Sequence, residues 1–133
     1  MTVDKVMIKR FVQDTLGCAC PEEVFRSIDC ERNVPLGGGV ILNSTITIGN
    51  RLLIHIVDEN QAFVEKHLAF LVSAGRKERD SRGLSRFRLV VVLDGSSGSG
   101  DAIKRIFDGL QVRDENIHLH CIRSDDKFLD FYH

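Results

Sequence analysis

Apolar residues recur at helical spacing near the start of the chain, on either side of Pro21. Pro21 suits the first position of a helix, with Cys20 as its N-cap. The segment NVPLGGG, residues 33–39, is rich in residues that break regular structure. The pattern therefore predicts a helical hairpin over residues 1–32, followed by a glycine-rich connection over residues 33–39.

After this connection the sequence pattern changes from helical to strand-like. Residues 40–48 (VILNSTITI) and 51–57 (RLLIHIV) are rich in β-branched side chains, which favour strands. They flank Gly49 and Asn50, a two-residue signal for a tight hairpin turn. The two segments are therefore predicted to pair as antiparallel strands.

The rest of the chain alternates between helical and strand patterns. Asn60 is expected to cap a long helix that ends at Gly75, before a charged loop over residues 76–86. Residues 87–94 form a continuous apolar run, as in a central parallel strand. Further along, a helix is expected over residues 101–110, a last strand over residues 117–122 and a short helix at the C-terminal end.

These elements predict one α/β domain over residues 1–133. Its sheet is expected to be mixed and four-stranded, with an N-terminal β-hairpin followed by a parallel βαβαβ unit. Helices would lie on the faces of the sheet. Residues 40–133 would hold the sheet and its helices, and the helical hairpin would precede them.

Composition narrows the class of protein. Hydrophobic residues make up 43% of the chain and charged residues 28%, which is typical of a folded globular domain. A net charge of −1 makes nucleic acid an unlikely partner, since such partners call for a strongly basic surface. No apolar run has the roughly 18 residues of a membrane span, and no secretory signal is recognisable. We therefore expect a cytoplasmic protein without a membrane partner, assembled as a homo-oligomer or with a protein partner.

The stretch LGCACPEEVF places Cys18 and Cys20 one residue apart at a predicted helix start. A helix N-terminus lowers the pKa of a thiol, and the thiolate is the form that binds metal or reacts. The pair could bind zinc or iron, cycle between thiol and disulfide, or simply pack where two helices turn. Cys30, His118 and His120 are possible further ligands, while Cys121 alternates with apolar residues and is expected in the core.

A glycine-rich segment follows the apolar run 87–94 and precedes a predicted helix, so its backbone N–H groups could hold an anion. Asp58 and Asp94 end two predicted strands at the same edge of the sheet and could hold magnesium. The segment is not a P-loop, because Asp101 and Ala102 stand where that motif needs Lys and Ser or Thr. The candidate ligand-binding residues are Asp58, Asp94, Gly95, Ser96, Ser97, Gly98, Ser99 and Gly100.

Local catalytic motifs such as GxSxG, HExxH or a zinc-deaminase signature do not occur in the sequence. Whether the protein is an enzyme is therefore left open. Two hypotheses follow from the sequence. The first is a thiol protein that binds a soft metal or cycles redox state through Cys18 and Cys20. The alternative is a non-catalytic α/β module that binds a ligand or a protein partner, with an anion site at the glycine-rich loop.

Overall fold

The structure is a computed structural model that describes residues 28–37, 39–49, 51–93, 100–110 and 115–123. These residues form five strands and two helices. In chain order the elements are β1 (Ile28–Gly37), β2 (Val40–Ile48), β3 (Leu52–Asp58), α2 (Gln61–Ser81), β4 (Arg86–Leu93), α3 (Asp101–Asp108) and β5 (Ile117–Arg123).

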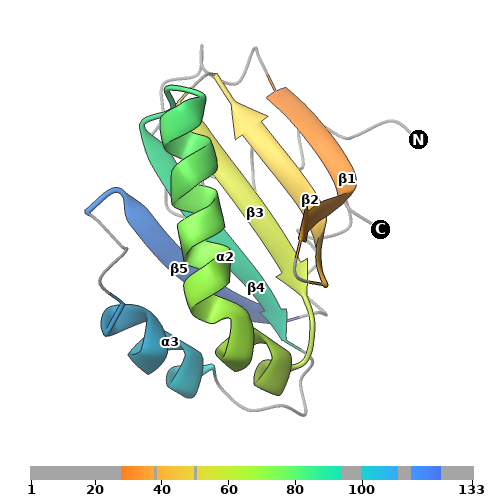
Figure 1. Ribbon diagram of the computed structural model, residues 1–133, viewed down its shortest axis with the longest axis vertical. Coiled ribbons are helices and arrows are strands. Elements are labelled where there is room, and N and C mark those ends of the chain that lie inside the picture. The colour runs from red at the N-terminus through yellow and green to blue at the C-terminus, as the bar shows by residue number, and fades with distance from the viewer. Residues whose placement is uncertain (1–27, 38, 50, 94–99, 111–114, 124–133) are drawn as a thin grey trace.

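The strands lie in the sheet in the same order as in the chain. β1, β2 and β3 pair antiparallel, whereas β3, β4 and β5 pair parallel. Helices α2 and α3 connect the parallel strands and lie side by side in front of the sheet in Figure 1. Both described helices therefore cover the same face of the sheet. Right-handed crossovers place their helices on one face when each new parallel strand is added on the same side of the previous one. The α/β class with a mixed sheet is confirmed.

The predicted count of four strands is wrong, because β1 adds a fifth strand at one edge. Residues 28–32 were expected in the helical hairpin and residues 33–39 in a break, but most of this stretch is strand. Pro35 is compatible with this position because an edge strand leaves one row of N–H groups without a ladder partner. The remainder of the expected helical hairpin, residues 1–27, lies outside the described residues, as does the expected C-terminal helix.

The hairpin between β2 and β3 is confirmed, with Ile48 paired to Leu52 across the turn. Asn60 caps α2 as predicted, and its side chain accepts a hydrogen bond of 2.8 Å from the backbone N–H of Phe63. The helix does not end at Gly75, however. It continues to Ser81, so the first part of the predicted charged loop is helical.

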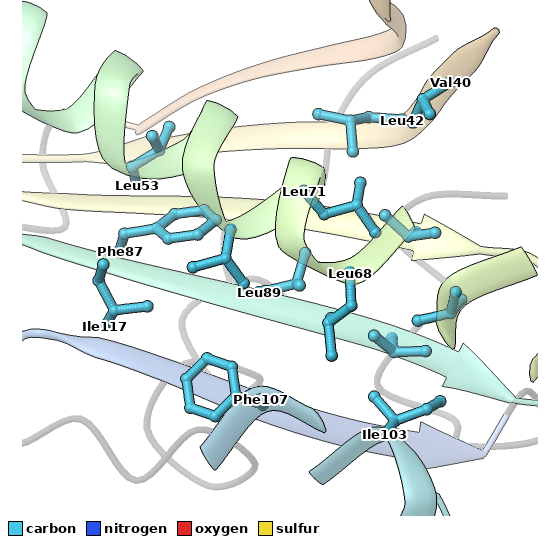
Figure 2. Packing of buried hydrophobic residues seen from close by; sticks show 14 of the residues in the cluster. Val40, Leu42, Leu53, Leu68, Leu71, Phe87, Leu89, Ile103, Phe107 and Ile117 are labelled. Carbon is cyan, nitrogen blue, oxygen red and sulfur yellow. The ribbon is translucent and has the colours of Figure 1, made fainter. Parts of the chain in front are cut away.

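The main core lies between the sheet and the two helices. Figure 2 shows side chains from both layers meeting there, among them Leu68, Leu71, Phe87 and Leu89. The opposite face of the sheet is buried as well, as the continuous apolar runs of β3 and β4 predict. Its inaccessible side chains include Ile46, Ile54, Ile56, Val90 and Val92. Neither α2 nor α3 has the length and the apolar character that crossing a membrane requires.

Candidate functional site

The predicted metal or redox site is only partly within the described residues, since Cys18 and Cys20 lie outside them. Cys30 is on β1 and His118 and His120 are on β5, the two edge strands of the sheet. Four strand spacings separate these edges, roughly 19 Å. A single metal ion therefore cannot take Cys30 together with either histidine within one such sheet.

The two described cysteines have the chemistry of packing residues. Burial is the main cause that raises the pKa of the Cys30 thiol, with smaller opposing contributions from Arg32 and Glu31. Burial also raises the pKa of Cys121. Both thiols are therefore protonated at neutral pH, and a protonated thiol is a poor ligand and a poor nucleophile.

Of the residues predicted to form the anion site, the structure describes Asp58 and Gly100, while residues 94–99 lie outside the described residues. Asp58 ends β3 beside Val92 of β4, and its backbone N–H donates to Asn43 Oδ1 at 3.1 Å. Gly100 begins α3 with a positive φ of 76°, and a Cβ there would press on Cys121. The N-cap of α3 is thus Gly100, which has no side chain to accept a capping hydrogen bond.

A different site emerges at the opposite end of the sheet. The C-terminal end of α2, the beginning of β1 and the end of β2 meet there in Figure 1. Between them is a hollow of about 300 Å³, which we call the acidic groove. Its lining residues are Asp29, Cys30, Glu31, Val34, Thr45, Thr47, Glu78 and Arg82.

Strand register brings the polar residues of the groove together. Glu31 pairs with Thr45 across β1 and β2, and Thr45 pairs with His55 across β2 and β3. Paired residues share a face of the sheet, so these three side chains form one row under the C-terminal end of α2. Glu78 of α2 reaches the end of this row, with its Oε1 atom 3.6 Å from His55 Nε2.

Two residues of this row, Thr45 and His55, have buried polar side-chain atoms without a hydrogen-bond partner among the described residues, and of the two only Thr45 lines the groove. Thr45 is only 6% exposed, and its hydroxyl oxygen Oγ1 is buried with no hydrogen-bond partner in the part of the chain that the structure describes. A buried hydroxyl without a partner destabilises a fold by roughly 1–3 kcal/mol. Thr45 nevertheless lines the groove, and a change of its χ1 rotamer would turn the hydroxyl towards a ligand there.

Glu78 is the charged centre of the groove. The His55 ring is the main cause that lowers the pKa of the Glu78 carboxyl, and Arg82 adds to the effect, while burial opposes both. The distance of 3.6 Å between Glu78 Oε1 and His55 Nε2 is longer than that of a strong hydrogen bond. Arg82 Nη1 donates to Glu78 Oε2 at 3.1 Å. Glu78 is therefore ionised at neutral pH and still has capacity to accept further donors.

The charge of the groove is negative. Among the described lining residues, Asp29, Glu31 and Glu78 contribute three carboxylates and Arg82 one guanidinium, which gives these residues a formal charge of −2. Yet no three His, Cys, Asp or Glu side chains among the described residues lie close enough to hold one metal ion. The carboxylates are instead spread around the groove. This spacing suits a ligand with several N–H donors better than it suits a single ion.

A second hollow of about 400 Å³ lies between α3 and β5, lined by Lys104, Asp108, Glu115 and His118 among others. It is larger than the acidic groove, but its described lining residues have a smaller excess of acidic over basic side chains, with Asp108 and Glu115 against Lys104. None of its lining residues has a buried polar side-chain atom without a partner. The acidic groove is therefore the better candidate, despite its smaller volume.

Sequence reasoning did not find this groove. Thr45 and His55 looked like ordinary strand residues, and Glu78 was placed in a loop. One signal was present: Ile28, Cys30, Val34 and Leu36 alternate with mostly polar residues, which is typical of a half-buried strand. That strand carries Asp29 and Glu31, but the register that sets Glu31 beside Thr45 cannot be read from the alternation.

Comparisons of the chain with protein-family models, with curated proteins and with solved structures find no match in any of the three. The function is therefore argued from the geometry alone.

Proposed function

We propose that this protein is a non-catalytic α/β ligand-binding module, and that its acidic groove takes a small organic cation with a primary ammonium or guanidinium group. The single observation that carries the proposal is the Thr45 hydroxyl, which no described residue satisfies and which belongs to a groove with three carboxylates among its described lining residues. Ammonium and guanidinium groups donate several hydrogen bonds at once. Such a group could satisfy Thr45 and two carboxylates together.

The size and polarity of the groove support a small polar ligand. A volume of about 300 Å³ is at the lower end of the range for ligand pockets. Thr45 and Thr47 line it, and Val34 is the only aliphatic side chain among its described lining residues. Affinity would therefore come from charge and hydrogen bonds, and would weaken as salt screens the carboxylates.

Arg82 shows how a cationic group can bind to the acidic groove. Its guanidinium already donates to Glu78 in the groove, at 3.1 Å from Oε2. The side chain is 43% exposed, so it is held loosely from the solvent side. A ligand guanidinium or ammonium would repeat this contact deeper in the groove, next to Thr45. Charge-assisted bonds of this kind are roughly twice as strong as neutral ones.

Calorimetric titration of the full chain with arginine methyl ester, putrescine and spermidine tests the proposal. At least one of them should bind saturably below about 10 mM at low salt. The variant Thr45→Val should bind it roughly tenfold more weakly, because a hydrogen bond to a charged group is lost. Ser44→Ala is the matched control. Ser44 Oγ is also buried without a partner, yet Ser44 does not line the groove.

Glu31→Gln should also weaken the same ligand, whereas Glu59→Gln removes an exposed carboxylate elsewhere and should have little effect. Equal losses from Glu31→Gln and Glu59→Gln would mean that only net charge attracts the amines. That result, or the absence of saturable binding by the unmodified protein, would refute the proposal.

A second proposal concerns Cys18 and Cys20, which lie outside the described residues. The spacing CxC before Pro21 supports a soft-metal or redox site there, with zinc or iron as the cofactor. Cys30 and the β5 histidines are on opposite edge strands, so they could not complete the same site together. Metal analysis of the purified protein tests this proposal.

A further inference from the structure

Four basic or imidazole side chains form a compact array on β4 and β5: Arg86, Arg88, His118 and His120. Phe87 of β4 points into the core between the sheet and the helices. Arg86 and Arg88 alternate with it, so they point to the opposite face. Arg88 pairs with His118 in the strand register, which places the two histidines on that same face. We call these four residues the basic array.

Arg88 is the exceptional member of the array. It is only 8% exposed, and its Nη1 atom lies 2.9 Å from Nε2 of His120. Its Nε–H is buried, and no described residue accepts a hydrogen bond from it. Within the described part of the chain no carboxylate pairs with Arg88, and the neighbouring charged group is the like-charged Arg86. The Arg88 guanidinium thus lies at a protein interior with no counter-charge among the described residues.

Such an arrangement is costly without an anion. Buried charges in proteins are almost always paired, because removing a charge from water is expensive unless an opposite charge replaces the solvent. The neighbouring side chains on this face include Val90 and Val92, which are inaccessible and apolar. A low-polarity surrounding strengthens the attraction between the guanidinium and any anion that reaches it.

We infer that Arg86, Arg88 and His118 bind a small oxyanion of the phosphate class where β4 and β5 begin. Arg88 is the anchor, since a guanidinium matches the geometry of two oxyanion oxygens. Arg86 and His118 are exposed, so this end of the array is open to solvent. His120 is a positioning residue: it accepts from Nη1 of Arg88 and thereby orients the remaining donors of the guanidinium.

The inference is independent of the acidic groove. The groove lies on the helix-covered face at β1 and β2, and the basic array lies on the other face at β4 and β5. The two sites would also select ligands of opposite charge. Loss of amine binding would therefore leave this inference untouched.

The test is a titration of the full chain with sodium phosphate, followed through the imidazole proton signals of His118 and His120. Sodium chloride at matched ionic strength is the reference, and sodium citrate separates carboxylate from phosphate selectivity. Phosphate should shift both signals saturably and raise both imidazole pKa values, because it supplies an anion beside groups that now face Arg86, Arg88 and Lys104. Tighter binding of citrate than of phosphate would overturn the assignment to the phosphate class.

Arg86→Gln should weaken phosphate binding at least fivefold while the fold is retained, since Arg86 is exposed. Arg105→Gln is the matched control, because it removes an exposed arginine from α3 on the other side of the molecule. Arg88→Lys should weaken binding more than Arg86→Gln; if that variant does not fold, the comparison of Arg86 with Arg105 decides. Equal effects of Arg86→Gln and Arg105→Gln, or signals that respond to phosphate only as they do to chloride, would overturn the inference.

Discussion

Gly75 of α2 packs directly against the aromatic ring of Phe87 in β4. A Cβ atom at Gly75 would overlap Cζ and both Cε atoms of that ring. Phe87 is itself fully buried and makes an edge contact with His55, with ring centroids 5.0 Å apart. The close approach of helix to sheet at this point therefore depends on the absence of a side chain at residue 75.

The variant Gly75→Ala should destabilise the protein by about 3 kcal/mol, a typical cost of overpacking a filled core. Helix propensity alone predicts the opposite sign, a gain of roughly 1 kcal/mol for alanine over glycine. Urea unfolding of the two proteins distinguishes these outcomes. Phe87→Leu in the Gly75→Ala background should recover part of the loss, since it removes the atoms that the new Cβ meets. A stabilised Gly75→Ala variant would contradict the packing described here.

The same glycine shows where sequence reasoning reaches its limit. Glycine commonly ends helices, so Gly75 was predicted as the end of α2. The structure uses it for close packing instead, and the helix continues to Ser81. Local patterns favour either role, and only the position of Phe87 on a neighbouring strand decides between them. Long-range contacts of this kind are not encoded in any short stretch of sequence.

Other parts of the fold could be predicted because their signals are local. The β2–β3 hairpin is specified by Gly49 and Asn50 between two β-branched runs, and Asn60 begins α2 through a contact with a residue three positions away. The edge strand β1 was missed because Pro35 and Gly37 suggested a break, although proline is tolerated at an edge. The acidic groove was missed for a different reason. It depends on register across three strands and on a helix that covers them.

The Thr45→Val variant should be more stable than the unmodified protein by about 1 kcal/mol in the absence of ligand. Valine is similar in shape to threonine and removes a buried hydroxyl that has no partner. Thermal unfolding measures this gain. Ser44→Ala should give a gain of the same sign, because its hydroxyl is also buried and unpartnered.

Ligand binding separates these two variants. Addition of a binding amine should raise the melting temperature of Ser44→Ala as much as that of the unmodified protein, and that of Thr45→Val much less. A residue kept at a cost in stability and needed for binding is typical of functional sites. Destabilisation by Thr45→Val would mean that the hydroxyl has a structural partner, and would remove the main support for the groove.

Acid should weaken the fold through His120. Its contact with Arg88 requires a neutral ring, because a guanidinium only donates and Nε2 must accept. Burial, and after it the charge of Arg88, lowers the pKa of His120 from 6.5 to about 4. The unfolded chain therefore binds a proton at a higher pH than the folded chain does. Stability is fully present above pH 6.5, falls as the pH drops towards about 4, and levels off below that value.

The full shift of the His120 pKa corresponds to roughly 3 kcal/mol, and we expect about half of it because the ring is partly solvated. Urea unfolding at a series of pH values measures the loss. His120→Gln keeps an acceptor for Arg88 without a titratable ring, so its stability should vary less over this range. Glu78 loses its own contribution only below its ordinary pKa of 4.5, so the two effects fall in different pH windows. Identical pH profiles for His120→Gln and the unmodified protein would contradict this assignment.

The cysteine pair predicts metal in the purified protein. We expect about one zinc or iron ion per chain when the protein is prepared without oxygen, chelators or a polyhistidine tag. Cys18→Ser with Cys20→Ser should abolish the metal, because serine is a poor ligand for soft metals. Cys121→Ser is the control. Cys121 is on the edge strand β5, where its thiol packs beside Gly100, so this variant should leave the metal content unchanged. Mass spectrometry measures the metal, and thiol titration of the native protein tests the redox alternative.

A metal-free protein with unreactive Cys18 and Cys20 would assign the pair to packing and leave the acidic groove as the first site to pursue.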